Sequence, residues 1–289
     1  MLNYADRGGE VEVTGVSDFD LFKIFECGQC FRWDADGNGV YTGVAMGRAA
    51  RLRSAGGSVF ISGTAEDFES VWRGYFDLDR DYARIREQLC IDDFMRCATG
   101  FGEGIRILRQ DRWEALCSFI ISQCNNIPRI KKIISVLCHE FGEKLEFGGE
   151  KFHNFPSAQR LAVLDAESLA PLRCGYRASY IISAARAVAD GTLDLDALSG
   201  ATVEAARAAL KRLKGVGDKV ADCVILFGLG ILDSFPLDTW MKRAVAAFYG
   251  AGFDPAVFSP YAGIAQQYIF YYIRNARGLL TGQTANSGI

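Results

Sequence analysis

Residues 210–223 read LKRLKGVGDKVADC and predict two amphipathic helices joined by a short turn. Gly215 and Gly217 flank Val216, so the backbone can reverse sharply there and positive φ angles are permitted at both glycines. Several amide groups then stay uncovered beside the N-terminus of the second helix, which favours an anion such as a DNA phosphate. A plain helix–turn–helix packing corner with glycine caps has the same pattern, so the hairpin alone leaves both interpretations open.

Lys219 falls in the first turn of the second predicted helix. The positive end of the helix dipole disfavours an ammonium there and favours the neutral, nucleophilic amine. Cys223 lies four residues later and therefore on the same helix face. Its thiol either shares a pocket with the amine or fills the core as a small apolar group.

A second candidate site residue, Asp238, follows the apolar second helix in the segment SFPLDTWMKR, residues 234–243. Pro236 enforces an extended approach, after which Asp238 is placed to cap the next helix. Alternatively, Asp238 lies close to Lys219, where a carboxylate can stabilise positive charge on a sugar ring and assist proton transfer.

The composition indicates a globular protein with two or three packed subdomains, because 49% of its 289 residues are hydrophobic. A formal net charge of −3 excludes a protein that coats nucleic acid through its overall charge, so any DNA binding requires a local basic patch. Two basic clusters are candidates, although each also fits a solvated helix face: Arg129, Lys131 and Lys132, and Lys211, Arg212 and Lys214.

The spacing of the cysteines and the length of the apolar runs indicate where in the cell the protein is expected. The scattered cysteines and the absence of an apolar N-terminal run predict a cytoplasmic protein that is not secreted. Residues 223–232 are too few to span a bilayer, so no membrane partner is expected. Cys27 and Cys30 form a lone CxxC, which favours two buried thiols over zinc, and no cysteine after Cys223 could complete a C-terminal iron–sulfur cluster.

The hydrophobic periodicity changes along the chain. Up to about residue 75 it predicts short antiparallel strands with glycine turns, including strands near Val40–Val44 and Val59–Ile61. From about Asp79 the three- and four-residue spacing predicts helices almost throughout, with Gly148-Gly149 as one of the breaks between them.

We therefore expect an α+β protein built from an antiparallel β domain and a mostly α-helical domain. Residues 1–95 would form the N-terminal β domain with a trailing helix, and residues 96–280 the helical domain, with a helix-hairpin-helix at about 203–229. Residues 281–289 would form a polar tail.

These motifs carry a family resemblance. Gly215-Val216-Gly217, Lys219 and Pro236-Leu237-Asp238 resemble the helix-hairpin-helix glycosylase superfamily, and KVADC at 219–223 resembles the 8-oxoguanine DNA glycosylase family in particular. Independent segments extend the resemblance over nearly the whole chain: CGQCFRW at 27–33, YFDLD at 75–79 and ILRQD at 107–111.

The resemblance implies a TBP-like N-terminal sheet, a lesion pocket between helical lobes and a bifunctional glycosylase/AP lyase. Lys219 would attack C1′ of a flipped nucleotide with Asp238 as its partner, release 8-oxoguanine and form a Schiff base that proceeds to β-elimination. No cofactor and no catalytic metal are implied. The carbonyls of Leu213 and Val216 would hold a structural monovalent cation.

It also implies the residues that bind the flipped base. The carbonyl of Gly28 would accept a hydrogen bond from N7–H of the oxidised base, a proton that guanine lacks. Gln266 and Phe270 are four residues apart and would offer an amide to the base edge and a ring for stacking, beside Cys223. Without the resemblance, Phe270 fits the core of an aromatic helix equally well.

The implied partner is double-stranded DNA with 8-oxoguanine opposite cytosine, bound by a monomer. Asn125 and Asn126 would fill the gap left by the flipped nucleotide, and Tyr176 would wedge the duplex. Arg129 and Arg177 would donate to the acceptors of the orphaned cytosine.

Two residues depart from the family pattern. Cys124 stands where a third asparagine is expected in the gap, and Trp240 where well-known members have a phosphate-binding histidine. Two other functions remain to be weighed: a monofunctional alkylpurine glycosylase that uses Asp238 and water, against which Lys219 argues, and a non-catalytic helix-hairpin-helix DNA-binding protein.

Overall fold

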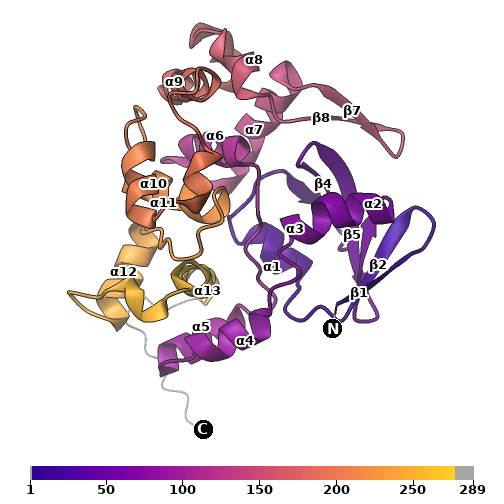
Figure 1. Cartoon of the computed structure of the whole chain (residues 1–289), viewed down its shortest axis with the longest axis vertical. Helices are drawn as coiled ribbons and strands as arrows, with labels where there is room; N and C mark the ends of the chain where they lie inside the picture. Colours follow the sequence, from indigo (N-terminus) through magenta and orange to yellow (C-terminus); the bar gives the residue numbers. More distant parts are fainter. Residues whose placement is uncertain (1, 277–289) are drawn as a thin grey trace.

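The computed structural model describes residues 2–276, in which one face of an antiparallel sheet packs against helices. The sheet has six strands in the order β1-β2-β6-β5-β4-β3, and the expected strands correspond to β4 and β6 (Figure 1). The strands are β1 (Asn3–Asp6), β2 (Glu10–Thr14), β3 (Trp33–Ala35), β4 (Tyr41–Ala45), β5 (Arg48–Ala55) and β6 (Ser58–Ser62).

Alternation of apolar and polar residues explains why this sheet has one buried face. In β2 the buried Val11 and Val13 pair with Ile61 and Val59 of β6. Helix α1 (Leu21–Glu26) interrupts the strands, and Trp33 stacks on its Phe25 at 4.6 Å between ring centroids. Three consecutive short helical segments follow β6 and complete this part of the molecule: α2 (Ala65–Asp67), a π-helical turn (Phe68–Trp72) and α3 (Arg73–Tyr75).

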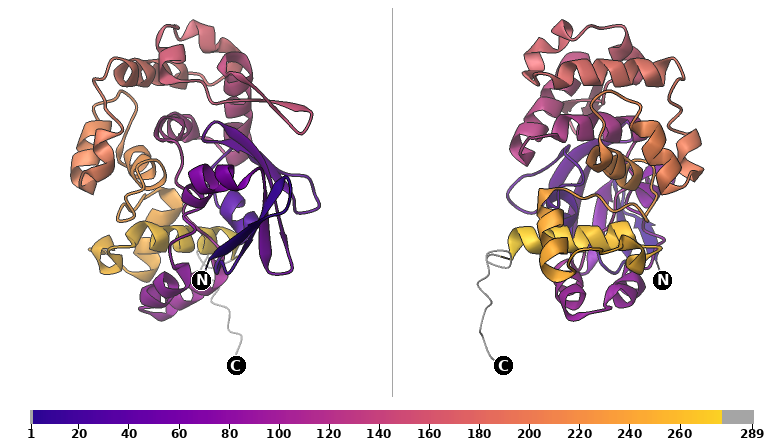
Figure 2. Two further views of the ribbon diagram at one scale, coloured as in Figure 1. Left: turned by 45° about the vertical axis from the view of Figure 1, so that its right-hand side comes forward. Right: turned by 90° about the vertical axis from the view of Figure 1, so that its left-hand side faces the viewer.

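Helices make up most of the rest of the chain, as the periodicity predicts, and lie on the other side of the molecule from the sheet (Figure 2). They are α4 (Tyr82–Leu89), α5 (Asp93–Phe101), α6 (Arg112–Ser122), α7 (Ile127–Phe141), α8 (Ala158–Ala162), α9 (Arg177–Ala189), α10 (Val203–Leu210), α11 (Asp218–Phe227), α12 (Thr239–Phe248) and α13 (Ala262–Asn275), with 3-10 turns at Glu167–Leu172, Ala197–Gly200 and Pro255–Phe258. Among residues 2–276, no helix is both long and apolar enough to cross a membrane. The polar tail expected at 281–289 lies outside the described residues.

Gly148-Gly149 lie in the expected break between helices, but the break also contains two strands that the periodicity did not predict. These residues form the turn of a β-hairpin between β7 (Lys144–Phe147) and β8 (Glu150–His153), with φ angles of 58° and 79°. Two consecutive positive φ angles match the twist of a tight hairpin, which Gly-Gly adopts without strain. The hairpin reaches toward the large sheet, where Glu150 pairs with Arg51 at 2.5 Å (Figure 2).

Helix α6 is the centre of the helical part, because every residue from Ala115 to Ile121 is buried. It approaches α11 closely: a Cβ on Gly228, just beyond α11, would lie 2.9 Å from the Cβ of Ala115. Phe119 of α6 stacks on Phe227 of α11 at 5.4 Å. Small residues at one contact and stacked rings at the next fix the spacing of the two helices.

An ion pair joins the two helices of the hairpin. Arg207 Nε of α10 donates to Asp222 Oδ1 of α11 at 2.7 Å, and the Asp222 side chain is only 8% exposed. Burial raises the pKa of Asp222, and the hydrogen bond from Arg207 acts in the opposite direction. The guanidinium therefore compensates a carboxylate that would otherwise be buried without a partner.

We expect Arg207→Ala to lower the free energy of unfolding at neutral pH by about 2 kcal/mol, because the Asp222 charge loses its partner. Without Arg207 the pKa of Asp222 rises further, so the carboxyl protonates as pH falls and the deficit shrinks in acid. Urea unfolding of wild type and variant at several pH values measures both effects.

The double variant Arg207→Ala/Asp222→Asn serves as the control. Its deficit at neutral pH should be smaller than that of Arg207→Ala, since the amide carries no charge. A deficit that is independent of pH and equal in both variants would contradict this account.

Candidate active site

The turn of the hairpin uses its two glycines differently. Gly215 has φ +84°, and a Cβ there would lie 2.2 Å from the ring of Tyr180. Gly217 has φ −97° with ψ −177°, so the expected need for positive φ holds only at Gly215. Gly217 is the N-cap of α11 without a side-chain cap, and nothing lies within 4 Å of the place of its Cβ. The N-terminus of α11 is therefore open to a ligand.

Exposed cations surround this turn. Lys211, Arg212 and Lys214 are all exposed, and Lys211 pairs with Asp218 at 2.6 Å. Lys242 and Arg243 of α12 are exposed as well. A local basic patch can thus exist on a chain of net negative charge.

Lys219 is the second residue of α11, and its side chain is half-buried. Its Nζ donates to Ser122 Oγ at 3.3 Å and lies 5.4 Å from the centroid of the Phe119 ring. The amine therefore points at the C-terminal end of α6.

Asp238 caps a helix and also borders the same cavity as Lys219. As the N-cap of α12, its Oδ1 accepts a hydrogen bond from the amide of Met241 at 2.8 Å. It also lines a cavity of about 260 Å³ together with Lys219. The other residues around this cavity come from the α1–β3 loop and from α6, α7, α12, α13 and the α6–α7 loop: Gly28, Phe31, Phe119, Ser122, Asn125, Asn126, Ile127, Ile130, Trp240, Phe270 and Arg274.

Close contacts hold α11, α13 and the segment before Asp238 together. Ser234 Oγ donates to the carbonyl of Asp222 at 3.0 Å, which ties the segment before Asp238 to α11. The amide of Gly263 donates to the carbonyl of Leu232 at 2.7 Å, and a Cβ on Gly263 would lie 2.4 Å from the side chain of Leu226. Helix α13 can therefore pack directly on α11 only because residue 263 has no side chain.

Gly28 lies at the rim of the cavity with φ +86°, and the place of its Cβ is 3.6 Å from the ring of Phe270. The neighbouring Gln29 is completely buried and fixes this loop. Its Nε2 donates to the carbonyls of Ile24 and Arg106 at 2.9 and 2.8 Å, and its Oε1 accepts from the amide of Leu108 at 2.9 Å. One side chain thus attaches the loop of the sheet domain to the strand-like segment before α6.

Cys223 and Gln266 are buried, and neither is among the residues that line the cavity. Burial raises the pKa of the Cys223 thiol to about 11, although the neighbouring Lys219 acts to lower it. Within residues 2–276, Oε1 of Gln266 is buried and has no hydrogen-bond partner. An unpartnered buried amide oxygen next to Phe270 suits a ligand that brings a donor.

The expected gap-filling residues form the loop between α6 and α7. Asn126 caps α7 by accepting from the amide of Arg129 at 3.0 Å, and Asn125 Nδ2 donates to the carbonyl of Ile121 at 2.8 Å. Cys124 is exposed at the loop tip with φ +49°. Asparagine adopts that region more readily than cysteine, so Cys124 costs the loop backbone energy.

The predicted opposite-strand residues differ in exposure. Tyr176 is 51% exposed and available as a wedge. Arg129 is exposed, with Nη2 donating to the carbonyl of Arg173 at 3.1 Å. Arg177 is buried, and its guanidinium donates to the carbonyls of Gln123 and Cys174. In this structure, therefore, Arg177 is not free to meet a base.

Sequence reasoning missed six of the residues that line the cavity: Phe31, Phe119, Ser122, Ile127, Ile130 and Arg274. Phe119 and Ser122 are three residues apart on α6, a spacing that places them on one helix face. Arg274 lies four residues after Phe270, and its guanidinium carbon is 5.2 Å from the ring centroid. Helical spacing from the recognised residues was the signal that could have found Arg274.

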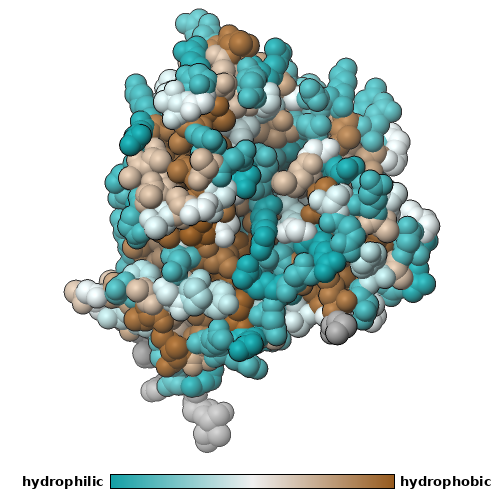
Figure 3. Space-filling model, viewed as in Figure 1, coloured by the Kyte–Doolittle hydropathy of each residue, from teal (hydrophilic) through white to brown (hydrophobic). Residues whose placement is uncertain are grey.

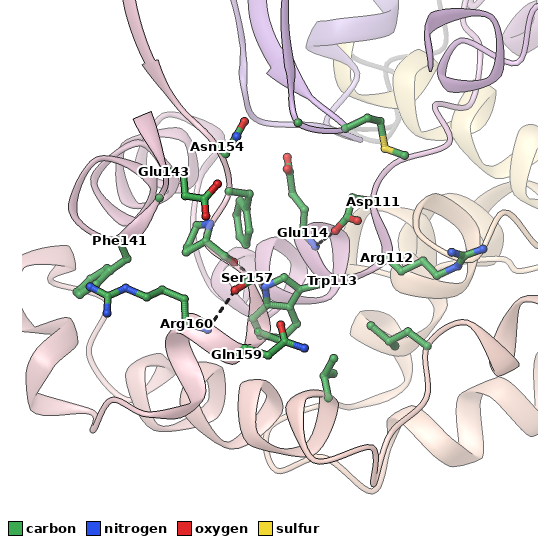
Figure 4. Close-up of a pocket in the computed structure, with 18 of the residues that line it drawn as sticks. Asp111, Arg112, Trp113, Glu114, Phe141, Glu143, Asn154, Ser157, Gln159 and Arg160 are labelled. Carbon is green, nitrogen blue, oxygen red and sulfur yellow. Dashed lines mark hydrogen bonds between the residues drawn. The ribbon is translucent and has the colours of Figure 1, made fainter. Parts of the chain in front are cut away.

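A larger cavity of about 960 Å³ contains none of the predicted site residues. Figure 4 shows its wall, where Asp111 and Ser157 accept from the amides of Glu114 and Arg160 as helix caps. The pair of Glu114 with Arg32, at 3.1 Å, contributes to the same wall. These groups satisfy one another and join the two parts of the chain, so we assign the cavity no reaction.

The surface on the side seen in Figure 3 is mixed, with hydrophobic residues gathered toward the lower left, in the region of α12. The exposed Trp240 and Phe248 belong to that helix. Trp240 also lines the cavity of Lys219, at the position of the expected histidine.

Comparison with known proteins gives matches over both parts of the chain. Residues 13–116 match the family described as 8-oxoguanine DNA glycosylase, N-terminal domain, and residues 117–256 match the HhH-GPD superfamily of base excision DNA repair proteins. The N-glycosylase/DNA lyase of Saccharomyces cerevisiae is 31% identical over 259 residues, which are 81% of this chain and 69% of the yeast protein.

Two solved structures are similar over almost their whole length. MBOgg1 in complex with a low-affinity DNA ligand has a TM-score of 0.91 at 43% identity, covering 96% of this chain and 99% of that chain. The Clostridium acetobutylicum 8-oxoguanine glycosylase/lyase, in complex with double-stranded DNA containing cytosine opposite 8-oxoG, has a TM-score of 0.89 at 37% identity, covering 96% and 98%.

The geometry of the turn generates a stability prediction. Gly215→Ala should lower the free energy of unfolding by about 3 kcal/mol, since alanine disfavours positive φ and its methyl group would overlap the Tyr180 ring. Gly217→Ala, whose backbone is extended and whose Cβ meets open space, should lose less than about 1 kcal/mol. Chemical denaturation measures both, and equal losses would refute the proposed difference between the two glycines.

Proposed function

The chain belongs to the 8-oxoguanine DNA glycosylase family and is a DNA N-glycosylase and AP lyase, and we propose that it removes 8-oxoguanine opposite cytosine by attack of Lys219. The observation that carries this mechanism is the shared cavity of Lys219 and Asp238, with the Gly28 loop and Phe270 on its other walls.

In the proposed reaction, the neutral amine of Lys219 attacks C1′ of a flipped nucleotide. The C1′–N9 bond breaks, its electron pair leaves with the base, and a proton replaces the sugar on the base. Loss of protons from nitrogen and opening of the sugar ring yield a Schiff base, after which removal of a C2′ proton expels the 3′ phosphate. Asp238 stabilises the positive charge that develops on the sugar.

Four residues are proposed to hold the base. The Gly28 carbonyl accepts the N7 proton, Phe270 stacks on the ring, and Gln266 uses its unpartnered amide oxygen on the base edge. Cys223 is proposed to contribute from its buried position beside Lys219. A carbonyl acceptor at N7 rejects guanine because guanine presents a lone pair there.

The loops around Asn125, Asn126 and Tyr176 are proposed to occupy the gap, while Arg129 and Arg177 bind the orphaned cytosine. Arg177 must then exchange the carbonyls of Gln123 and Cys174 for the acceptors of the base.

The turn Gly215-Val216-Gly217 is proposed to bind a DNA phosphate through its uncovered amides. The Leu213 carbonyl accepts one hydrogen bond, from the Val216 amide at 3.1 Å, which leaves a lone pair. The carbonyls of Leu213 and Val216 are proposed to hold a structural monovalent cation, which would neutralise charge between the turn and the phosphate.

Borohydride trapping on duplex DNA with 8-oxoguanine opposite cytosine tests the mechanism. We expect a covalent adduct with wild type, no adduct with Lys219→Gln, and a rate at least about 100-fold lower with Asp238→Asn. Trapped complex on denaturing gels and released base by chromatography provide the measurements.

An undamaged duplex is the substrate control. Base release by wild type without an adduct would instead support a monofunctional glycosylase that uses Asp238 and water. Binding without release or adduct would support a non-catalytic hairpin module, and full activity of Lys219→Gln would contradict amine catalysis.

Opposite-base preference is tested by Arg129→Ala. The ratio of excision rates opposite cytosine and opposite adenine should fall about tenfold, since one base-specific contact is worth about 1–3 kcal/mol. The matched control is Lys132→Ala, which removes an exposed charge from the same helix and should weaken binding to both duplexes equally. An unchanged ratio in Arg129→Ala would remove this residue from the cytosine contact.

A further inference from the structure

Ser122 is the last residue of α6 and accepts a hydrogen bond from the Lys219 amine at 3.3 Å. Its own hydroxyl proton is directed elsewhere, because Ser122 Oγ donates to the carbonyl of Phe119 at 2.8 Å. A hydroxyl has one proton, so toward Lys219 this oxygen presents only lone pairs. The chain of contacts therefore runs in one direction, from the amine to Ser122 and from Ser122 to the Phe119 carbonyl.

Two helix ends act on the same nitrogen in opposite senses. Lys219 belongs to the first turn of α11, whose positive end disfavours an ammonium, and it lies beside the C-terminal end of α6, whose negative end favours one. The Phe119 ring, 5.4 Å from Nζ, adds a weak attraction for the cation.

We propose that Ser122 is a positioning residue for the attack by Lys219, an inference that rests on the proposed function of the amine. A neutral amine has two N–H bonds and one lone pair. The hydrogen bond to Ser122 and the Phe119 ring fix the position of the nitrogen beside the cavity that Asp238 and Phe270 also line, so that its lone pair can face C1′. Ser122 thereby selects the orientation in which the nitrogen can reach C1′.

The position of Ser122 also links the amine to the gap-filling loop. The next residue, Gln123, has its carbonyl held by Arg177, and Asn125 Nδ2 donates to the carbonyl of Ile121 at 2.8 Å. The acceptor of Lys219 and the loop proposed to enter the DNA gap are consequently one short, tightly bonded segment. Placement of that loop in the duplex and placement of the amine depend on each other.

The test is single-turnover release of 8-oxoguanine by Ser122→Ala and Ser122→Thr over a range of pH, with DNA affinity measured separately in the Lys219→Gln background. We expect Ser122→Ala to be about tenfold slower at its optimum with unchanged affinity, a typical effect of losing one positioning contact. Its rate should rise at lower pH than that of wild type, because the ammonium loses an acceptor that stabilises it more than the amine. Ser122→Thr keeps the hydroxyl and should restore both rate and profile.

Ser70→Ala is the matched control. Ser70 Oγ also donates to a backbone carbonyl within its helical run, that of Glu66 at 2.6 Å, but it belongs to the sheet domain. Its variant should behave as wild type. Thermal unfolding identifies any variant that is misfolded. If Ser122→Ala is misfolded, the rate and pH profile of Ser122→Thr are compared with those of wild type instead.

Three outcomes would overturn the inference. Ser122→Ala could keep the rate and pH profile of wild type, or Ser122→Thr could be as slow as Ser122→Ala. In the third outcome, Ser122→Ala loses DNA affinity in proportion to its rate and its pH profile does not move. Any of them combined with a trapped wild-type adduct leaves the proposed function intact. Absence of an adduct from wild type would overturn the proposed function, and this inference with it.

Discussion

The close packing of α6 against α11 is the constraint on which the site depends. The contact of Ala115 with Gly228 and the stacking of Phe119 on Phe227 bring the two helices together along their length. Because α6 ends at Ser122, this packing delivers a helix C-terminus to a lysine at the start of α11. A bulkier residue at either small position would separate the helices and move the amine away from its acceptor.

A second set of contacts joins the sheet domain to this centre. Gln29 bonds with both Arg106 and Leu108, and the buried Arg106 donates to the carbonyls of Asp18 and Asp77. These bonds are buried and cross long stretches of sequence, so they are strong in the low-dielectric interior. The sheet itself contributes no acid, base or nucleophile to the cavity, but it holds Gly28 against Phe270. Its contribution to the site is therefore geometric.

Much of this architecture follows from local patterns in the sequence. Helical spacing, the Gly215–Gly217 turn and the Pro236–Asp238 segment predict the two helices and make Lys219 and Asp238 candidates, because each depends on neighbours in the chain. The choice of catalytic roles for them required the family resemblance, and those roles stay a prediction. The β7–β8 hairpin was missed because four-residue strands around Gly148-Gly149 are too short to show a period. Ser122 was missed for a different reason: its role depends on a contact with Lys219 across 97 residues, which no local pattern encodes. The boundary near residue 95 stays a prediction.

The guanidinium of Arg177 lies against the carbonyls of Gln123 and Cys174. If Arg177 contacts the orphaned cytosine as proposed, it must give up these internal hydrogen bonds to do so. Recognition of the opposite strand then becomes a substitution of one set of acceptors for another, and its free energy is the difference between two sets of hydrogen bonds. Such a residue gains little from a duplex in which it finds no acceptor of its own.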